Sequence, residues 1–88
     1  MFEYDSAKST ANKAKHGIDF EEAQALWNDD RRVEAQSTSS VGEERWLVIG
    51  RGPDGKLWTA IVTYRDSIRI ISVRRARDYE VREYERQG

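Results

Sequence analysis

Near Arg32 the apolar residues of this chain change their spacing from a helical to a strand-like period. Before that point they recur every three or four residues, as on one face of a helix. After it they alternate, or cluster in short β-branched and aromatic runs. A chain of 88 residues has room for one core only, because two smaller cores would not offset the chain entropy lost on folding. The sequence therefore predicts a single α+β domain over residues 1–88.

The first predicted helix follows a short extended piece at residues 2–4. Asp5 is a suitable N-cap for a helix that runs to about His16, and Gly17 can close it in the left-handed conformation. The thin apolar stripe expected to face the sheet consists of Ala7, Ala11, Ala14 and Ile18. The polar side of the helix consists of Lys8, Asn12, Lys15 and His16.

Two further helices are predicted, one before and one after the strand-like region. Asp19 and Glu22 form a variant of the capping box, so a second helix is expected over about residues 20–28. Its inward side chains are expected to be Phe20, Ala23, Leu26 and Trp27. The charged segment 77–86 is expected to form the last helix, with the apolar handles Tyr79, Val81 and Tyr84.

Four runs with strand character lie between these helices. They cover residues 33–37, 46–49, 57–64 and 68–73. Residues 52–55 form a strong turn signal, and the polar segment 32–44 is expected to be a solvated connection. The predicted architecture is thus two N-terminal helices, a four-stranded antiparallel sheet and a C-terminal helix, with the helices on one face of the sheet.

The two tight turns predict which side chains share a face. We expect Arg65 opposite Ile68 and Arg51 opposite Lys56. The core face would then hold Leu47, Ile49, Trp58, Ala60, Val62, Tyr64, Ile71 and Val73, and Val48 would lie on the other face. The open face would hold Trp46, Thr59, Ile61, Thr63, Arg65, Ser72 and Arg74. An aromatic ring among arginines and hydroxyls is suited to stacking a base and holding a phosphate.

The net charge of −1 conceals an asymmetry along the chain. Residues 1–44 carry 5 basic and 10 acidic side chains, and residues 45–88 carry 10 basic and 6 acidic ones, which gives −5 and +4. Residues 65–77 hold five arginines and one aspartate. An anionic partner responds to such a local patch rather than to the net charge, and guanidinium groups bind phosphate through two hydrogen bonds.

Composition also narrows the class of function. The chain has no cysteine and one histidine, so it lacks the ligands of most transition-metal sites, and neither a metal nor a cofactor is expected. It contains no apolar run of the roughly 20 residues that cross a bilayer, and its N-terminus lacks the regions of a signal peptide. We expect a cytoplasmic protein without a membrane partner.

Motifs along nearly the whole chain resemble those of the BrnT family of toxins. The opening motif consists of Phe2-Glu3-Tyr4-Asp5, Lys8, Asn12, Lys15-His16-Gly17 and Phe20-Glu21-Glu22-Ala23. The central motif is Gly42-Glu43-x-Arg45. The closing motif consists of Thr63-x-Arg65 and Ile68-Arg69-Ile70-Ile71-Ser72-x-Arg74-Arg75-Ala76, followed by Glu80 and Tyr84. The motifs occur in order and with ordinary spacing.

The resemblance implies a fold like that of the RelE and ParE toxins, and an endoribonuclease activity that arrests growth. It implies a partner as well, a ribbon-helix-helix antitoxin of the BrnA type that neutralises the toxin in a hetero-oligomer. Because that antitoxin binds DNA, the chain itself would meet DNA only indirectly.

RNA cleavage sets simple chemical requirements, because the 2′-hydroxyl of RNA can serve as the nucleophile. The enzyme needs a base, an acid and cations near the phosphate. We expect Arg65 and Arg74 to contact the scissile phosphate, with Arg69 or Arg75 in support. The alternative is that these arginines form surface ion pairs with nearby carboxylates, which contribute little energy.

The base and the acid are less clearly marked. Histidine titrates near neutral pH in general, so His16 is a candidate, although a histidine in the last turn of a helix often only caps free carbonyls. Glu43 and Glu80 are candidate bases, and Tyr84 could donate a proton or stack on a base. Lys15 and Trp46 are expected to bind RNA, and Trp46 could also be covered by the antitoxin, since the two roles do not exclude each other.

Two other function classes remain open from the sequence. A ParE-like toxin would inhibit a protein target without cutting RNA. An inactive relative would act only as a binding module in the antitoxin complex. The first would arrest growth without RNA fragments, and the second would not be toxic when expressed alone.

Overall fold

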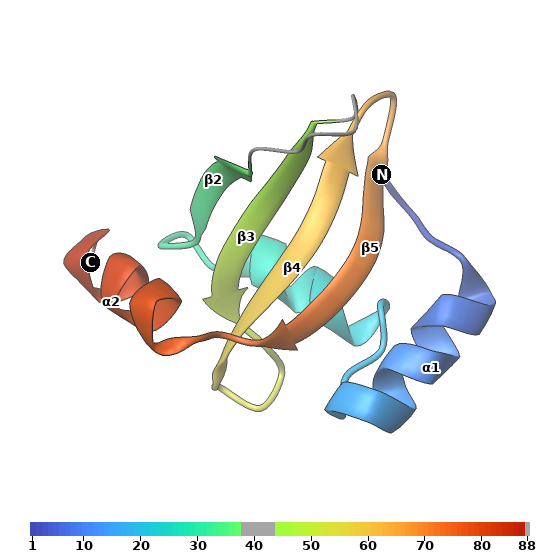
Figure 1. Cartoon of the computed structure of the whole chain (residues 1–88), viewed down its shortest axis with the longest axis horizontal. Coiled ribbons are helices and arrows are strands. Elements are labelled where there is room, and N and C mark those ends of the chain that lie inside the picture. Colours follow the sequence, from blue (N-terminus) through green and yellow to red (C-terminus); the bar gives the residue numbers. More distant parts are fainter. Residues whose placement is uncertain (38–43, 88) are drawn as a thin grey trace.

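The computed structural model describes residues 1–37 and 44–87. The described helices and strands are β1 (Phe2–Glu3), α1 (Ser6–His16), η1 (Glu22–Asn28), β2 (Val33–Ser37), β3 (Arg45–Arg51), β4 (Leu57–Tyr64), β5 (Ile68–Arg75) and α2 (Asp78–Gln87). The strands form one sheet in the order β1-β5-β4-β3-β2 (Figure 1). The predicted α+β class is confirmed. No helix within the described ranges has the length and apolar character needed to cross a membrane.

The sheet has one strand more than expected and is mixed rather than purely antiparallel. β1 pairs in parallel with β5, through Phe2 with Ile68 and Glu3 with Arg69. The amide of Ile68 also donates to the carbonyl of Met1 at 2.8 Å. The prediction of four antiparallel strands was therefore wrong, because it missed the parallel edge strand β1. A strand of two residues is too short to show an alternating pattern in the sequence.

Helix α1 has the predicted ends but presents an unexpected face. Asp5 Oδ1 accepts from the amides of Ala7 and Lys8 at 2.8 and 3.2 Å, and Gly17 closes the helix at φ 85°. The buried residues of α1 are Ser9 and Asn12, and the predicted stripe is exposed at Ala7, Ala11 and Ala14. The reason is that α1 lies along the outer edge of β5, where backbone groups need polar partners rather than apolar ones.

The second helix, η1, is a 3₁₀ helix rather than an α-helix. Its capping pair is present as expected. The amide of Glu22 donates to Asp19 Oδ1 at 2.7 Å, and Glu22 Oε1 accepts from the amide of Asp19 at 3.0 Å. Three predicted inward residues are buried, namely Phe20, Ala23 and Leu26, while Trp27 is half-buried against the core.

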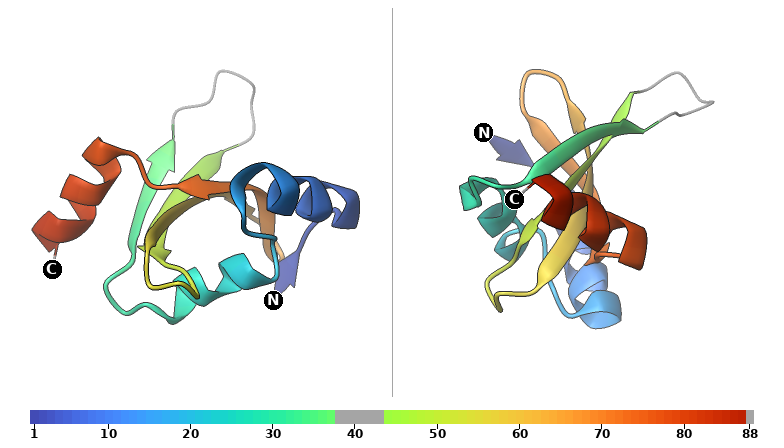
Figure 2. Two further views of the ribbon diagram at one scale, coloured as in Figure 1. Left: turned by 90° about the horizontal axis from the view of Figure 1, so that it is seen from below. Right: turned by 90° about the vertical axis from the view of Figure 1, so that its left-hand side faces the viewer.

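The helices do not share one face of the sheet, which corrects the predicted layering. Figure 2 shows α1 and α2 at opposite margins of the sheet, with η1 covering one broad face. The core lies between η1 and that face, and includes Val48, Ala60, Val62 and Val73. Helix α2 packs against β2 and β3 and bonds to Thr59, which points away from this core. We call the face that carries Thr59 the open face.

The turn between β3 and β4 is one residue shorter than predicted. Gly52 pairs with Lys56 through a 2.9 Å hydrogen bond, so the loop is Pro53–Gly55, with Gly55 at φ 78°. A left-handed glycine at the third position is typical of three-residue hairpin loops. Arg51 consequently lies opposite Leu57. This shift reverses the predicted sides of β3. Trp46 and Val48 face the core, and Leu47 and Ile49 lie on the open face.

A β-bulge divides the β4–β5 pair into two halves. In the half that lies far from the β4–β5 turn, the predicted pairs of Ile61 with Ser72 and Thr59 with Arg74 are present. Beyond the bulge Tyr64 lies opposite Ile68, so Arg65 is in the turn. Ile70 is buried in place of Ile71, and Tyr64 is 36% exposed. An extra residue on one strand is a local irregularity that alternation alone does not reveal.

The first part of the polar segment forms an edge strand. Val33–Ser37 is β2, as its alternation predicted, and it pairs with the whole first part of β3. Three of its five residues are exposed, which is consistent with a strand at the margin of the sheet.

Candidate functional site

Helix α1 is held beside β5 by the side chain of Asn12. Its Nδ2 donates to the carbonyls of Ile18 at 2.8 Å and Val73 at 3.0 Å, and its Oδ1 accepts from the amide of Val73 at 3.3 Å. The side-chain amide thus pairs with both backbone groups of Val73, as a neighbouring strand would. Ser9 Oγ adds a second anchor, because it accepts from the amide of Phe20 at 2.9 Å. These bonds set the position of α1 relative to the sheet.

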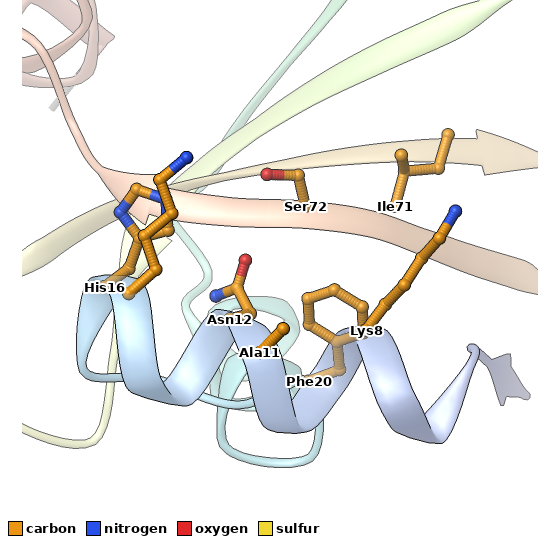
Figure 3. Close-up of a pocket in the computed structure, with 8 residues that line it drawn as sticks. Lys8, Ala11, Asn12, His16, Phe20, Ile71 and Ser72 are labelled. Carbon is orange, nitrogen blue, oxygen red and sulfur yellow. The ribbon is translucent and has the colours of Figure 1, made fainter.

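A cleft of about 220 Å³ opens between α1 and β5. We call it the α1–β5 cleft, and it is lined by Lys8, Ala11, Asn12, Lys15, His16, Phe20, Ile71 and Ser72. His16 and Lys8 lie toward opposite ends of it, and Ser72 and Ile71 project from β5 (Figure 3). Its volume is below the range of about 300–1,000 Å³ that is usual for sites enclosing whole small molecules. The cleft suits one base or one ribose-phosphate group of a longer chain.

The spacing of residues on α1 accounts for the charge of this cleft. Lys8, Asn12 and Lys15 follow one another at intervals of four and three residues, which places them on one face of the helix. Since Asn12 is bonded to β5, both lysines are brought to the same side. None of the described residues that line the cleft is acidic. The cleft is therefore cationic and favours an anion such as phosphate.

His16 lies in the last turn of α1, at one end of the cleft, and is half-buried. The sequence alone is also compatible with a His16 that caps free carbonyls at the end of α1. Among the described residues its imidazole makes no hydrogen bond or ion pair, so both ring nitrogens are available to a ligand in the cleft. A histidine in such a position can take up or release a proton during a reaction.

Arg74 follows the cleft residue Ser72 by two positions on β5, does not line the cleft, and is bonded to a buried carboxylate. Its guanidinium donates to the two carboxylate oxygens of Glu80 at 2.7 and 3.0 Å. Thr59 Oγ1 and the amide of Arg77 also donate to Glu80, at 3.0 and 2.8 Å. Burial raises the pKa of Glu80, but these hydrogen bonds outweigh burial and hold the pKa below its ordinary value. In this arrangement Arg74 anchors α2.

The other predicted arginines are spread over the length of β5. Arg65 lies in the turn before β5 and Arg74 near the end of β5, so their backbones are roughly 20 Å apart at about 3.4 Å per residue. At this separation the two arginines are not placed to hold one phosphate between them. Arg69 lies opposite Thr63 and is exposed. Arg75 lies over the ring of Trp58 at 5.3 Å, on the side of the sheet away from Arg74.

The two predicted aromatic contacts also have structural partners. Trp46 is half-buried on the core face, with its ring 5.8 Å from that of Tyr64, so it does not belong to the open face. Tyr84 is buried on α2, and its hydroxyl donates to Asp29 Oδ2 at 2.6 Å. Glu43 lies outside the described residues. Of the predicted site residues, the structure thus brings His16 and Lys15 together.

Of the residues that line the cleft, only Lys15 and His16 were predicted site residues; Lys8 was missed, and Ser72 was predicted only as part of the open face. The signal for Lys8 was present in the sequence, since it shares the helical stripe of Asn12, Lys15 and His16. Nothing in the sequence shows that this stripe faces β5 rather than solvent. That depends on the bonds between Asn12 and Val73, which join residues 61 positions apart.

Nearly the whole of this architecture matches one known protein family. A model of the ribonuclease toxin BrnT, of type II toxin–antitoxin systems, matches residues 4–80. The matched range includes the α1–β5 cleft, all of β2 to β5 and the Arg74–Glu80 pair. A comparison with curated proteins found no match. The chain therefore belongs to the BrnT family of ribonuclease toxins of type II toxin–antitoxin systems.

Proposed function

We propose that this chain is a metal-independent endoribonuclease that cuts RNA in the α1–β5 cleft and arrests growth in the cytoplasm. The observation that carries the proposal is the convergence of Lys8, Lys15 and His16 on one cleft without a carboxylate among its described lining residues. A ribonuclease of this kind needs no group other than proton-transfer groups and cations, since the 2′-hydroxyl attacks the adjacent phosphate.

In this proposal each cleft residue has a separate task. The imidazole of His16 transfers a proton to or from the reacting oxygens, and the ammonium groups of Lys8 and Lys15 offset the charge that builds up on the phosphorane. Ala11, Phe20 and Ile71 provide an apolar surface for the base or ribose. The products would be a 2′,3′-cyclic phosphate and a free 5′-hydroxyl.

A type II toxin has a cognate antitoxin as its partner. We propose that this partner is a ribbon-helix-helix protein of the BrnA type, which neutralises the chain in a hetero-oligomer and binds DNA on behalf of the complex.

The test is to express the native chain and the His16→Gln variant from a tight promoter and to map RNA ends. We expect arrest and new ends with the native chain, and cleavage lower by about 10²- to 10⁴-fold in the variant, the usual contribution of a proton-transfer group. The double variant Lys8→Gln/Lys15→Gln should lose about 10²-fold, as sites do when a charge-stabilising group is removed. Purified native chain should cleave equally well in EDTA.

Lys56→Gln is the matched control, because Lys56 is an exposed lysine next to the β3–β4 turn and does not line the cleft. It should cleave like the native chain. Growth arrest without new RNA ends would contradict the nuclease and indicate a protein target. Absence of toxicity in a folded native chain would indicate a binding module.

A further inference from the structure

A second cationic feature lies on the open face, at the end of the sheet away from α2. Thr63 on β4 lies opposite Arg69 on β5. On its other side, Trp46 pairs with Val62, which places Arg45 of β3 next to Thr63. All three side chains point away from the core, because their neighbours Val62 and Ile70 are core residues. We call Arg45, Thr63 and Arg69 the arginine row.

The unsatisfied hydroxyl of Thr63, at the centre of the row, points to a ligand. The residue is 1% exposed, and its Oγ1 has no hydrogen-bond partner among the described residues. Buried hydroxyls nearly always have a partner, because an unmade hydrogen bond is costly. The cross-strand neighbours of Thr63, Arg45 and Arg69, are exposed and have long cationic side chains, so an oxyanion bound by them would lie near this hydroxyl.

The two arginines lack counter-charges as well. Within the described part of the chain, no ion pair or hydrogen bond engages the guanidinium of Arg45 or of Arg69, and both residues are exposed. Glu3 lies next to Arg69 in the β1–β5 pairing, but no ion pair joins the two side chains. By contrast, Arg74 and Arg32 are each bonded to a carboxylate. Two unpaired guanidiniums on either side of a donor hydroxyl form a site for an oxyanion.

The row also lies at a useful distance from the α1–β5 cleft. Ser72 lines the cleft, and Arg69 precedes it by three residues on the same strand, or about 10 Å. Arg45, Thr63 and Arg69 lie near the ends of β3, β4 and β5, and among the described elements no helix crosses this end of the three strands in Figure 1. A chain bound in the cleft can therefore continue across the open face.

We propose that the arginine row binds a second backbone phosphate of the RNA strand whose scissile phosphate occupies the α1–β5 cleft. The strand runs from the cleft over β5 and β4 toward β3, and Thr63 Oγ1 donates to the phosphate oxygen held by the two guanidiniums. This inference rests on the proposed function, because the ligand of the row is the RNA that the cleft cuts.

The test measures binding without cleavage. The probe is a fluorescent single-stranded RNA with 2′-O-methyl groups at every position, which has no attacking hydroxyl, and its anisotropy is followed at several salt concentrations. The double variant Arg45→Gln/Arg69→Gln should bind more weakly, with the salt slope smaller by about 0.7, the value for one phosphate contact on a single strand. The control Arg82→Gln, an exposed arginine on α2, should leave affinity and slope unchanged.

The variant Thr63→Val separates the ligand role from a structural one. Valine has the shape of threonine without the hydroxyl, so thermal stability should be equal or higher, while affinity for the probe should fall. An unchanged salt slope in the double arginine variant, or unchanged affinity in Thr63→Val, would contradict the proposal that the arginine row binds a phosphate.

The outcomes also distinguish the row from the proposed function. If His16→Gln abolishes cleavage and the row variants bind like the native chain, the nuclease stands and the row fails. If the row variants show the expected loss of binding but the native chain cuts no RNA, the row stands and the nuclease fails. If the native chain neither binds the probe nor cuts RNA, both are overturned.

Discussion

Asn12 shows how one side chain can decide the position of a functional element. Its amide pairs with the amide and the carbonyl of Val73, and thereby occupies the edge of β5 at the point that β1 does not reach. The same bonds turn the face with Lys8 and Lys15 toward the sheet. Asn12 thus positions the cleft without being required to touch a substrate itself.

Replacing Asn12 by alanine should destabilise the protein and impair cleavage together. Asn12→Ala removes three buried hydrogen bonds and leaves backbone groups of Val73 and Ile18 without partners, so we expect a loss of about 2–3 kcal/mol in the free energy of unfolding. Urea denaturation would measure it. Thr10→Ala is the control, since the Thr10 hydroxyl is exposed and bonds only within α1. A loss of the same size in Thr10→Ala would contradict this role of Asn12.

At the scale of elements, α2 is attached to the sheet mainly through polar contacts. Glu80 accepts from Arg74 and Thr59, and Tyr84 donates to Asp29. Asp29 also accepts from the amide of Arg51 at 3.0 Å, so the segment after η1, strand β3 and helix α2 meet at one carboxylate. Burial raises the pKa of Asp29, but these hydrogen bonds hold it below its ordinary value. Ionised Glu80 and Asp29 therefore stabilise the attachment of α2.

This attachment makes stability dependent on pH in the acid range. A carboxyl group whose pKa is lower in the folded than in the unfolded protein stabilises fully above its unfolded pKa, and the stabilisation is lost as pH falls through the folded pKa. For Glu80 we expect the free energy of unfolding to decline below about pH 4.5, its ordinary pKa. Urea denaturation from pH 7 to pH 3 would show the decline.

The variant Glu80→Gln provides the comparison. It should be less stable at pH 7 by about 3 kcal/mol, because Arg74 loses its buried counter-charge, and its stability should depend less on pH between 5 and 3. Glu85→Gln, at an exposed position of α2, should follow the native curve. A pH dependence in Glu80→Gln as steep as in the native chain would assign the acid sensitivity to other carboxyls.

At the scale of the whole molecule, the sheet is most strongly supported at its centre. β4 has strands on both sides and contributes Trp58, Ala60 and Val62 to the core under η1. The margins β1 and β2 each have one neighbouring strand, and β1 is two residues long. Local stability should therefore fall from β4 outward.

Hydrogen exchange provides a direct measurement of this gradient. Amides of β4 that bond to β3 or β5 should exchange only through global unfolding, and those of β2 through smaller openings that need less free energy. NMR-detected exchange in native buffer would rank the strands. Protection in β2 equal to that in β4 would mean that the sheet opens only as one unit.

Local sequence patterns predicted most of the helices and strands and several of their ends. The change of period near Arg32 predicted helices before strands, and Asp5, Gly17 and the Asp19–Glu22 pair marked helix ends that the structure confirms. These features rest on bonds between residues close in the chain, and local patterns report them well. The family motifs likewise indicated a BrnT ribonuclease toxin, which the family comparison confirms.

Which side chains meet depends on contacts between residues far apart in the sequence. One residue in the length of the β3–β4 loop moved Trp46 from the open face to the core, because successive strand residues point to opposite sides. The arginines of residues 65–77 are close in sequence, but the extended strand β5 spreads them along its length and beyond its two ends. The cleft exists because Asn12 bonds to Val73 across 61 positions. Contacts at such separations leave no periodic trace in the sequence, so a fold is needed to bring Lys8, Lys15, His16 and Ser72 together.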